Sequence, residues 1–106
     1  MNQELKANKS HSNSVELAQK IEEAKEHIKV GGTYVHYKSP DKPYKVIAIG
    51  LQEADEEPCV IYQAQYGDKI IWVRNLNDWL AQVQYESNTT GTRFKELPAP
   101  NDTSIL

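Results

Sequence analysis

The sequence has little cysteine, and this excludes two kinds of site. Cys59 is the single cysteine among 106 residues, so the chain can form no intramolecular disulfide and no cluster of thiolate metal ligands. Acidic residues at positions 53 and 55–57 lie just upstream of it, and they disfavour the thiolate that a nucleophile requires. We therefore expect Cys59 to be a small buried apolar residue.

An excess of positive charge is also lacking. The formal net charge is -3, and residues 33–97 carry seven Lys and Arg against nine Asp and Glu. A protein that neutralises phosphates generally should be clearly basic, so we expect no non-specific nucleic-acid binding. No apolar run approaches membrane-spanning length and no signal-peptide pattern is present, which predicts no membrane association and a cytoplasmic location.

Histidines are few and scattered. His11, His27 and His36 lie far apart in the sequence, and together with a single cysteine they match no recognised metal-ligand spacing. The sequence therefore predicts no metal site, no cofactor and no set of catalytic residues.

What is present divides the chain into four segments. Residues 1–13 are polar without apolar spacing, which predicts a disordered arm, and residues 98–106 are expected to be a disordered tail. Residues 14–30 predict an amphipathic helix. Residues 32–97 contain most of the aromatics and should form a small β-barrel domain.

The predicted helix has clear end signals. Asn13 can cap it, Glu16 stands where a capping box needs an acid, and Gly31-Gly32 can end it. Its apolar stripe consists of Leu17, Ile21, Ala24 and Ile28. We expect this stripe to pack on the rest of the domain, and the alternative is a homodimer contact between two helices.

Short β-type runs separated by turn signals follow the helix. Strands are expected at Thr33–Lys38, Tyr44–Leu51, Cys59–Tyr66, Lys69–Arg74, Gln82–Tyr85 and Arg93–Leu97. Ser39–Pro43 should be a turn, because two prolines do not suit a paired central strand, and Asn75–Ala81 should be one helical turn. This pattern predicts a mainly β fold, either a small SH3-like barrel or a strongly bent antiparallel sheet, preceded by one amphipathic helix.

The expected hairpin around Gly67-Asp68 decides which face carries Trp72. A two-residue loop there places Tyr62 opposite Val73, so that Trp72 and Arg74 lie on the outer face beside two glutamines. An exposed indole beside an arginine is typical of a binding surface. A one-residue slip of the register would turn Trp72 inward, and both interpretations remain open.

His36, Arg74 and Arg93 each allow a functional and a structural interpretation. His36 can be an acid or base or a polar contact to a ligand, or a partly buried histidine bonded to backbone. The two arginines can recognise a carboxylate or phosphate, or form a structural ion pair with a residue such as Asp78 or Glu96.

Several of these residues resemble the pattern of a known protein family. The runs Tyr34-x-His36-Tyr37-Lys38, Val60-x-Tyr62, Trp72-Val73-Arg74 and Arg93-Phe94 resemble a small bacterial family known only as domain of unknown function 1653. The resemblance covers about residues 32–97. It implies a compact β-rich domain and supplies no reaction. The positions that it carries over are His36, Tyr37, Trp72, Arg74, Arg93 and Phe94.

The leading hypothesis is a non-enzymatic binding module for a peptide, a nucleotide or a protein partner. Its predicted ligand-binding residues are His36, Tyr37, Trp72, Arg74 and Arg93. The alternative is an enzyme or sensor for a small metabolite, with His36 as acid or base and an arginine holding an anion. A third hypothesis is self-pairing, through the helix stripe or through an open strand edge.

Overall fold

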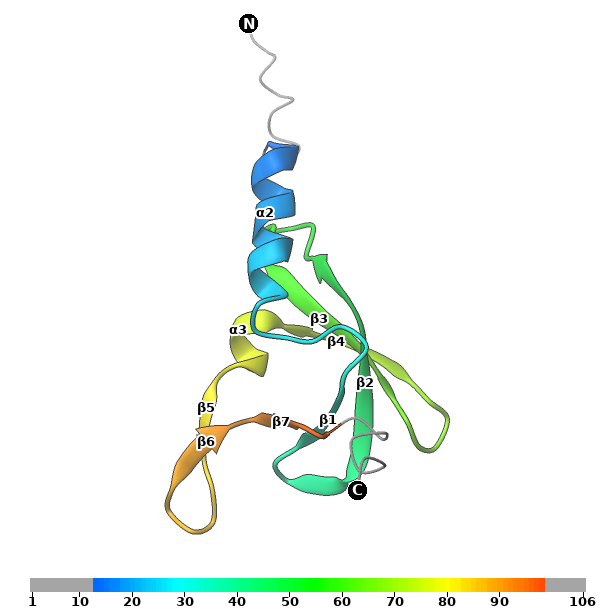
Figure 1. The fold of residues 1–106 in the computed structure, drawn as a ribbon, viewed down its shortest axis with the longest axis vertical. Coiled ribbons are helices and arrows are strands. Elements are labelled where there is room, and N and C mark those ends of the chain that lie inside the picture. The colour runs from blue at the N-terminus through cyan, green and yellow to red at the C-terminus, as the bar shows by residue number, and fades with distance from the viewer. Residues whose placement is uncertain (1–12, 99–106) are drawn as a thin grey trace, which may run out of the picture.

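The computed structural model describes residues 13–98 (Figure 1). The predicted arm, apart from its last residue, and the predicted tail, apart from its first, lie outside this range. Helix α2 (Ser14–Ala24) precedes the strands and lies against one end of the sheet (Figure 1). No helix within residues 13–98 is long and apolar enough to cross a membrane.

The cap of α2 forms as its sequence indicates. The side chain of Asn13 accepts a hydrogen bond from the backbone N–H of Val15 at 2.7 Å, which satisfies one of the free donors of the first turn. The regular helix ends at Ala24 rather than at residue 30, and turns continue to Gly31, whose φ is 88°. Ala24 and Ile28 are buried in the core, so the apolar stripe packs on the protein's own sheet.

Five strands form one antiparallel sheet with the order β4-β3-β2-β1-β7. Their bounds are β1 Thr33–His36, β2 Ser39–Leu51, β3 Pro58–Ala64, β4 Ile71–Asn75 and β7 Phe94–Glu96. A short helix, α3 (Leu76–Trp79), follows β4, and β5 (Gln82–Gln84) pairs with β6 (Thr90–Thr92) in a separate hairpin. The prediction of a mainly β fold behind one N-terminal helix is confirmed.

The sheet is open. Strands β4 and β7 are its two edges, and no pairing among the described residues joins them, so the SH3-like barrel is not confirmed. The predicted turn over Ser39–Pro43 is wrong, because these residues begin β2, and the turn of the β1–β2 hairpin is Tyr37-Lys38. The prolines are tolerated because β2 begins to pair with β3 only at Tyr44, so Pro43 has a single paired neighbour strand.

An aromatic cluster forms the core beneath the inner face of the sheet, which we define as the face with the buried side chains of Val46, Val60 and Tyr62. Trp79 of α3 is 2% exposed and makes edge-to-face contacts with Tyr34 and Tyr62. The quadrupoles of the two rings make this edge-to-face arrangement favourable. The short helix α3 therefore places the indole of Trp79 under the sheet.

The β3–β4 hairpin has a different register from the expected one. Tyr62 pairs with Trp72, not with Val73, so Trp72 and Arg74 lie on the inner face, and the prediction that they share the outer face with the glutamines is wrong. The loop is longer than Gly67-Asp68, because the N–H of Ala64 donates to the carbonyl of Ile70. Trp72 nevertheless stays 49% exposed, because β4 is at the edge of the sheet.

Candidate functional site

All five strands of the sheet contribute residues to the candidate site at one end of the inner face. A cavity of about 290 Å³ opens there. It is lined by His36, Lys38, Ser39, Tyr44, Tyr62, Arg74 and Phe94. His36 ends β1, Arg74 lies on β4 and Phe94 begins β7, so residues far apart in the sequence meet in one place.

Arg74 is held in position by two contacts. Its Nη1 donates to Oδ2 of Asp78 at 2.7 Å, and its guanidinium carbon lies over the ring of Phe94, 5.3 Å from the centroid. Asp78 lies on α3, four residues further on, so the short helix sets the direction of the guanidinium. The Arg74 side chain is 28% exposed, which leaves part of it open to a ligand.

Arg93 makes a hydrogen bond and an ion pair with the same aspartate, Asp78. Its Nε donates to the backbone carbonyl of Asp78 at 3.0 Å, and its Nη2 lies 3.6 Å from Oδ1 of that residue. One carboxylate therefore faces two guanidinium groups. The structural interpretation of both arginines as partners of Asp78 is correct, and the positive charges around this carboxylate exceed the negative ones.

The surroundings of His36 favour its neutral form. Its Nδ1 accepts a hydrogen bond from the backbone N–H of Lys38 at 3.1 Å, so the ring proton is on Nε2. Burial lowers the pKa of His36 below its usual value, and the positive charges of Arg74, Arg93 and Lys38 lower it further. Its ring stands edge-on to Phe94, with the centroids 5.1 Å apart.

Three of the predicted ligand-binding residues do not line this cavity: Tyr37, Trp72, and Arg93, which is connected to it through Asp78. Tyr37 is in the β1–β2 turn, packs beside His36 and faces Tyr85, and with Gln84 it borders a separate open hollow. Trp72 is on the same face as Arg74 but does not line the cavity. The structure thus brings His36 and Arg74 together, connects Arg93 through Asp78, and leaves Tyr37 and Trp72 at the periphery.

Two tyrosines that sequence reasoning did not single out also belong to the site. Tyr44 and Tyr62 line the cavity, and the Tyr44 hydroxyl is 2.6 Å from that of Tyr66. Burial and then the hydrogen bond to Tyr66 raise the pKa of Tyr44 to about 12. In the sequence, Tyr44 and Tyr62 alternate with the same period of two as Val46 and Val60, which indicates that they share the inner face. No nearby residue indicated that the end of β1 and the start of β7 would lie beside them.

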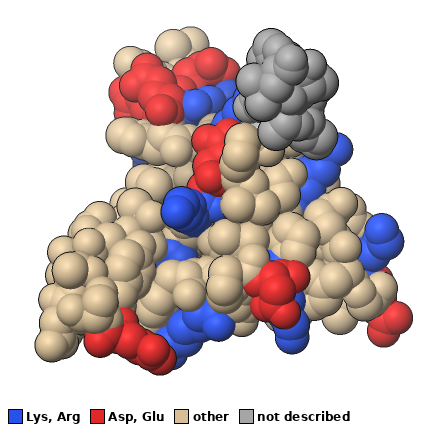
Figure 2. Space-filling model, turned by 60° about the horizontal axis from the view of Figure 1, so that its bottom comes forward, with Lys and Arg blue, Asp and Glu red and all other residues tan. Residues whose placement is uncertain are grey.

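The face of the molecule drawn in Figure 2 is mixed in charge, with Lys and Arg interspersed with Asp and Glu rather than gathered into a patch of one sign. No group of three or more His, Cys, Asp or Glu side chains within residues 13–98 is placed to hold a metal ion.

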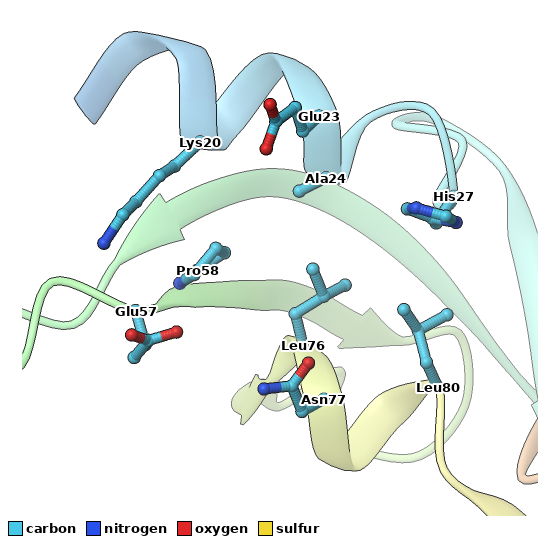
Figure 3. A pocket seen from close by; sticks show the side chains of 9 residues that line it. All are labelled: Lys20, Glu23, Ala24, His27, Glu57, Pro58, Leu76, Asn77 and Leu80. Atoms are coloured by element: carbon cyan, nitrogen blue, oxygen red, sulfur yellow. The ribbon is translucent and has the colours of Figure 1, made fainter. Parts of the chain in front are cut away.

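A second cavity of about 290 Å³ lies between α2 and α3 (Figure 3). Ala24, Leu76 and Leu80 point into it from facing elements, while Glu23 and His27 stand at its rim. None of the predicted site residues lines it. Polar side chains also line it (Lys20, Glu23, His27, Glu57 and Asn77), but its lining contains no arginine and no aromatic ring, so we take the His36–Arg74 cavity as the candidate site.

Comparisons with known proteins agree with the fold. The family model described as a protein of unknown function, DUF1653, matches residues 32–96. The crystal structure of a DUF1653 protein from Bordetella bronchiseptica is similar with a TM-score of 0.52 and 24% identity, and the alignment covers 60% of this chain and 81% of that one. A search of curated proteins finds no match. The solved structure supports the fold and assigns no activity.

Proposed function

We propose that this chain, which belongs to the DUF1653 family of proteins of unknown function, is a binding module that holds an anionic group of its ligand in the His36–Arg74 cavity. The observation that carries the proposal is the convergence of Arg74, Arg93 and Lys38 around a neutral histidine, with Asp78 as the facing carboxylate. A guanidinium that is already oriented loses little entropy when it binds an anion.

The walls of the cavity indicate what accompanies the anionic group. Phe94, Tyr44 and Tyr62 present aromatic surface, while Ser39 and the Nε2–H of His36 can donate hydrogen bonds. At about 290 Å³ the cavity is at the lower end of the range for ligand pockets, roughly 300–1,000 Å³. It suits a small carboxylate or phosphate compound, or one acidic or phosphorylated moiety of a larger peptide or nucleotide.

Tyr37 and Trp72 extend this site as flanking contacts. Tyr37 is next to His36, and Trp72 is two residues before Arg74 on the same face of β4. A ligand longer than the cavity would pass over one of them. In this proposal the ligand-binding residues are therefore Arg74, His36 and Arg93, with Tyr37 and Trp72 at the margin.

NMR chemical-shift mapping tests the proposal. Inorganic phosphate, AMP and a phosphotyrosine peptide are titrated separately into ¹⁵N-labelled protein, with the Nε–H signals of both arginines observed. We expect the largest shifts at Arg74, His36 and Phe94 for at least one of the three ligands. Shifts confined to loops remote from Arg74 would refute the proposal.

An R74Q variant makes the test specific. It removes the guanidinium and keeps a polar side chain, and it should abolish saturable binding. K45Q is the matched control, because Lys45 is an exposed cation opposite Gln63 on the outer face and its loss changes the net charge equally. Equal weakening by both variants would indicate a non-specific charge effect and would contradict the assigned site.

An enzymatic function is the second candidate, and one observation favours it. His36 and Arg74 line the same cavity, and the Nε2–H of neutral His36 can donate a hydrogen bond to negative charge that develops on a substrate whose anion is held by Arg74. The two candidates separate experimentally, because H36Q should keep ligand affinity within a few-fold in a binding module but abolish turnover in an enzyme.

A further inference from the structure

Strand β4 is an unprotected sheet edge. Ile70, Ile71, Trp72 and Val73 are 51%, 56%, 49% and 62% exposed, and they are consecutive in the chain. No charged residue or proline interrupts the run between Lys69 and Arg74. Natural proteins usually protect such an edge with charged residues, prolines, bulges or short strands, because its free backbone groups can pair with another strand.

The opposite edge shows the usual protection. Strand β7 has three residues, and two of them are the exposed, charged Lys95 and Glu96. The same sheet therefore has one edge with charge and one without it. This contrast indicates that β4 is adapted to being covered.

The backbone of β4 shows which groups are free. The N–H of Ala64 donates to the carbonyl of Ile70, so Ile70, Trp72 and Arg74 direct their N–H and C=O groups toward β3. In an antiparallel ladder the alternate residues point the other way. The N–H and C=O groups of Ile71 and Val73 therefore face outward from the edge.

We propose that the occupant of this edge is a second copy of the chain, paired antiparallel through β4 about a two-fold axis at Trp72. Ile71 of each copy then lies opposite Val73 of the partner subunit. Both residues have outward backbone groups, so each of the two symmetry-related pairs exchanges both of its hydrogen bonds. The strand is self-complementary in this register.

The same register matches the side chains. On the outer face, Ile71 and Val73 meet their counterparts and extend an apolar surface that includes Ile61 and the exposed Ile47 in the bulge opposite it. On the inner face, Trp72 lies opposite Trp72 of the partner subunit, an aromatic cross-strand pair that is favourable at the closely spaced, non-hydrogen-bonded position. No two like charges lie directly opposite each other.

The size of the contact sets the expected strength. A standard interface buries about 800 Å² per partner, and an edge of five residues buries less, so we expect a reversible dimer rather than an obligate one. The argument for this pairing does not rest on the proposed ligand site, although the two surfaces share Trp72. The pairing also places Ile70 of the partner subunit beside Arg74.

Sedimentation velocity over a protein concentration series tests the inference. We expect the wild-type protein to shift from monomer to dimer with increasing concentration. V73K places two lysines against apolar partners across the axis, so it should raise the dissociation constant by about tenfold or more. V15K is the matched control, because Val15 is 71% exposed on α2 and remote from β4, and it should leave association unchanged.

A second variant tests whether a loss of dimerisation in V73K results from unfolding. V73P removes only an N–H that points away from β3, so the β3–β4 ladder keeps its bonds while one symmetric pair of dimer bonds is lost. We expect V73P to be monomeric with an unchanged far-ultraviolet circular dichroism spectrum. A wild-type protein that stays monomeric at millimolar concentration, or a dimer that persists in V73K and V73P, would overturn the proposal.

Discussion

The indole of Trp79 lies flat against the ring of Phe94, with the centroids 3.7 Å apart and the planes 6° from parallel. The guanidinium carbon of Arg74 lies over the same phenyl ring, 5.3 Å from its centroid. Phe94 is therefore shared by the core and the candidate site. A change in core packing reaches the arginine through a single ring.

Removal of this ring should cost both stability and binding. We expect F94A to lower the free energy of unfolding by about 3–5 kcal/mol, since it leaves a cavity beside Trp79, and F94L to cost less. Urea denaturation followed by tryptophan fluorescence measures the loss. V15A, at an exposed position, should stay within about 0.5 kcal/mol of the wild type. A small loss in F94A would mean that the stack contributes little to the core.

Asp78 should restrain anion binding. D78N removes the carboxylate that faces Arg74 and Arg93, so we expect phosphate to bind several-fold more tightly at low salt. Because the Asp78 side chain is 50% exposed, stability should fall by no more than about 1 kcal/mol. E22Q changes the net charge equally at an exposed helix position and should leave the affinity unchanged. Weaker phosphate binding in D78N would show that Asp78 serves mainly to orient the arginines.

Stability should depend on pH through His36. Its pKa in the folded state is lowered, so the unfolded chain takes up a proton first as pH falls. The contribution of His36 is therefore fully present above its unfolded pKa of about 6.5 and is lost as pH falls through the folded pKa. An NMR titration of the ring protons should give a pKa below 6.5. H36Q should remove this part of the pH dependence, and an identical profile in both proteins would contradict the assigned environment.

The Tyr44–Tyr66 hydroxyl pair should be visible in an alkaline titration. We expect Y66F to lower the pKa of Tyr44 from about 12 toward its ordinary value, because the neutral Tyr44 hydroxyl loses its hydrogen-bond partner. Absorbance of the tyrosinate ion measures the change. Y85F, which alters a tyrosine away from this pair, is the control. A Tyr44 pKa that is the same in Y66F as in the wild type would show that burial alone sets it.

Local signals in the sequence predicted the elements well. The structure contains the cap at Asn13, the alternation of Val60, Tyr62 and Ala64 on one face, and the helical turn that bears Trp79. These features depend on neighbours only a few residues apart, so the sequence contains what decides them. The prolines of β2 misled the prediction, because whether a strand is paired on one side or two is not a local property.

The sequence predicted several residues of the candidate site but not how they come together. His36, Arg74 and Arg93 were chosen because their chemistry was unusual in a strand-rich chain, and they do lie around one aspartate or one cavity. Their convergence required β1, β4 and β7 to end at the same place. That arrangement depends on strand order, which no spacing within the sequence specifies.

Periodicity and turn residues act over short distances, so they were enough to specify a small, mainly β domain behind one capped helix. The face of Trp72 and the open edge at β4 depend instead on how whole strands pair in the folded protein. A five-residue connection between paired strands instead of a two-residue one moves every side chain of β4 to the other face, and the Gly67-Asp68 pair does not specify which of the two forms.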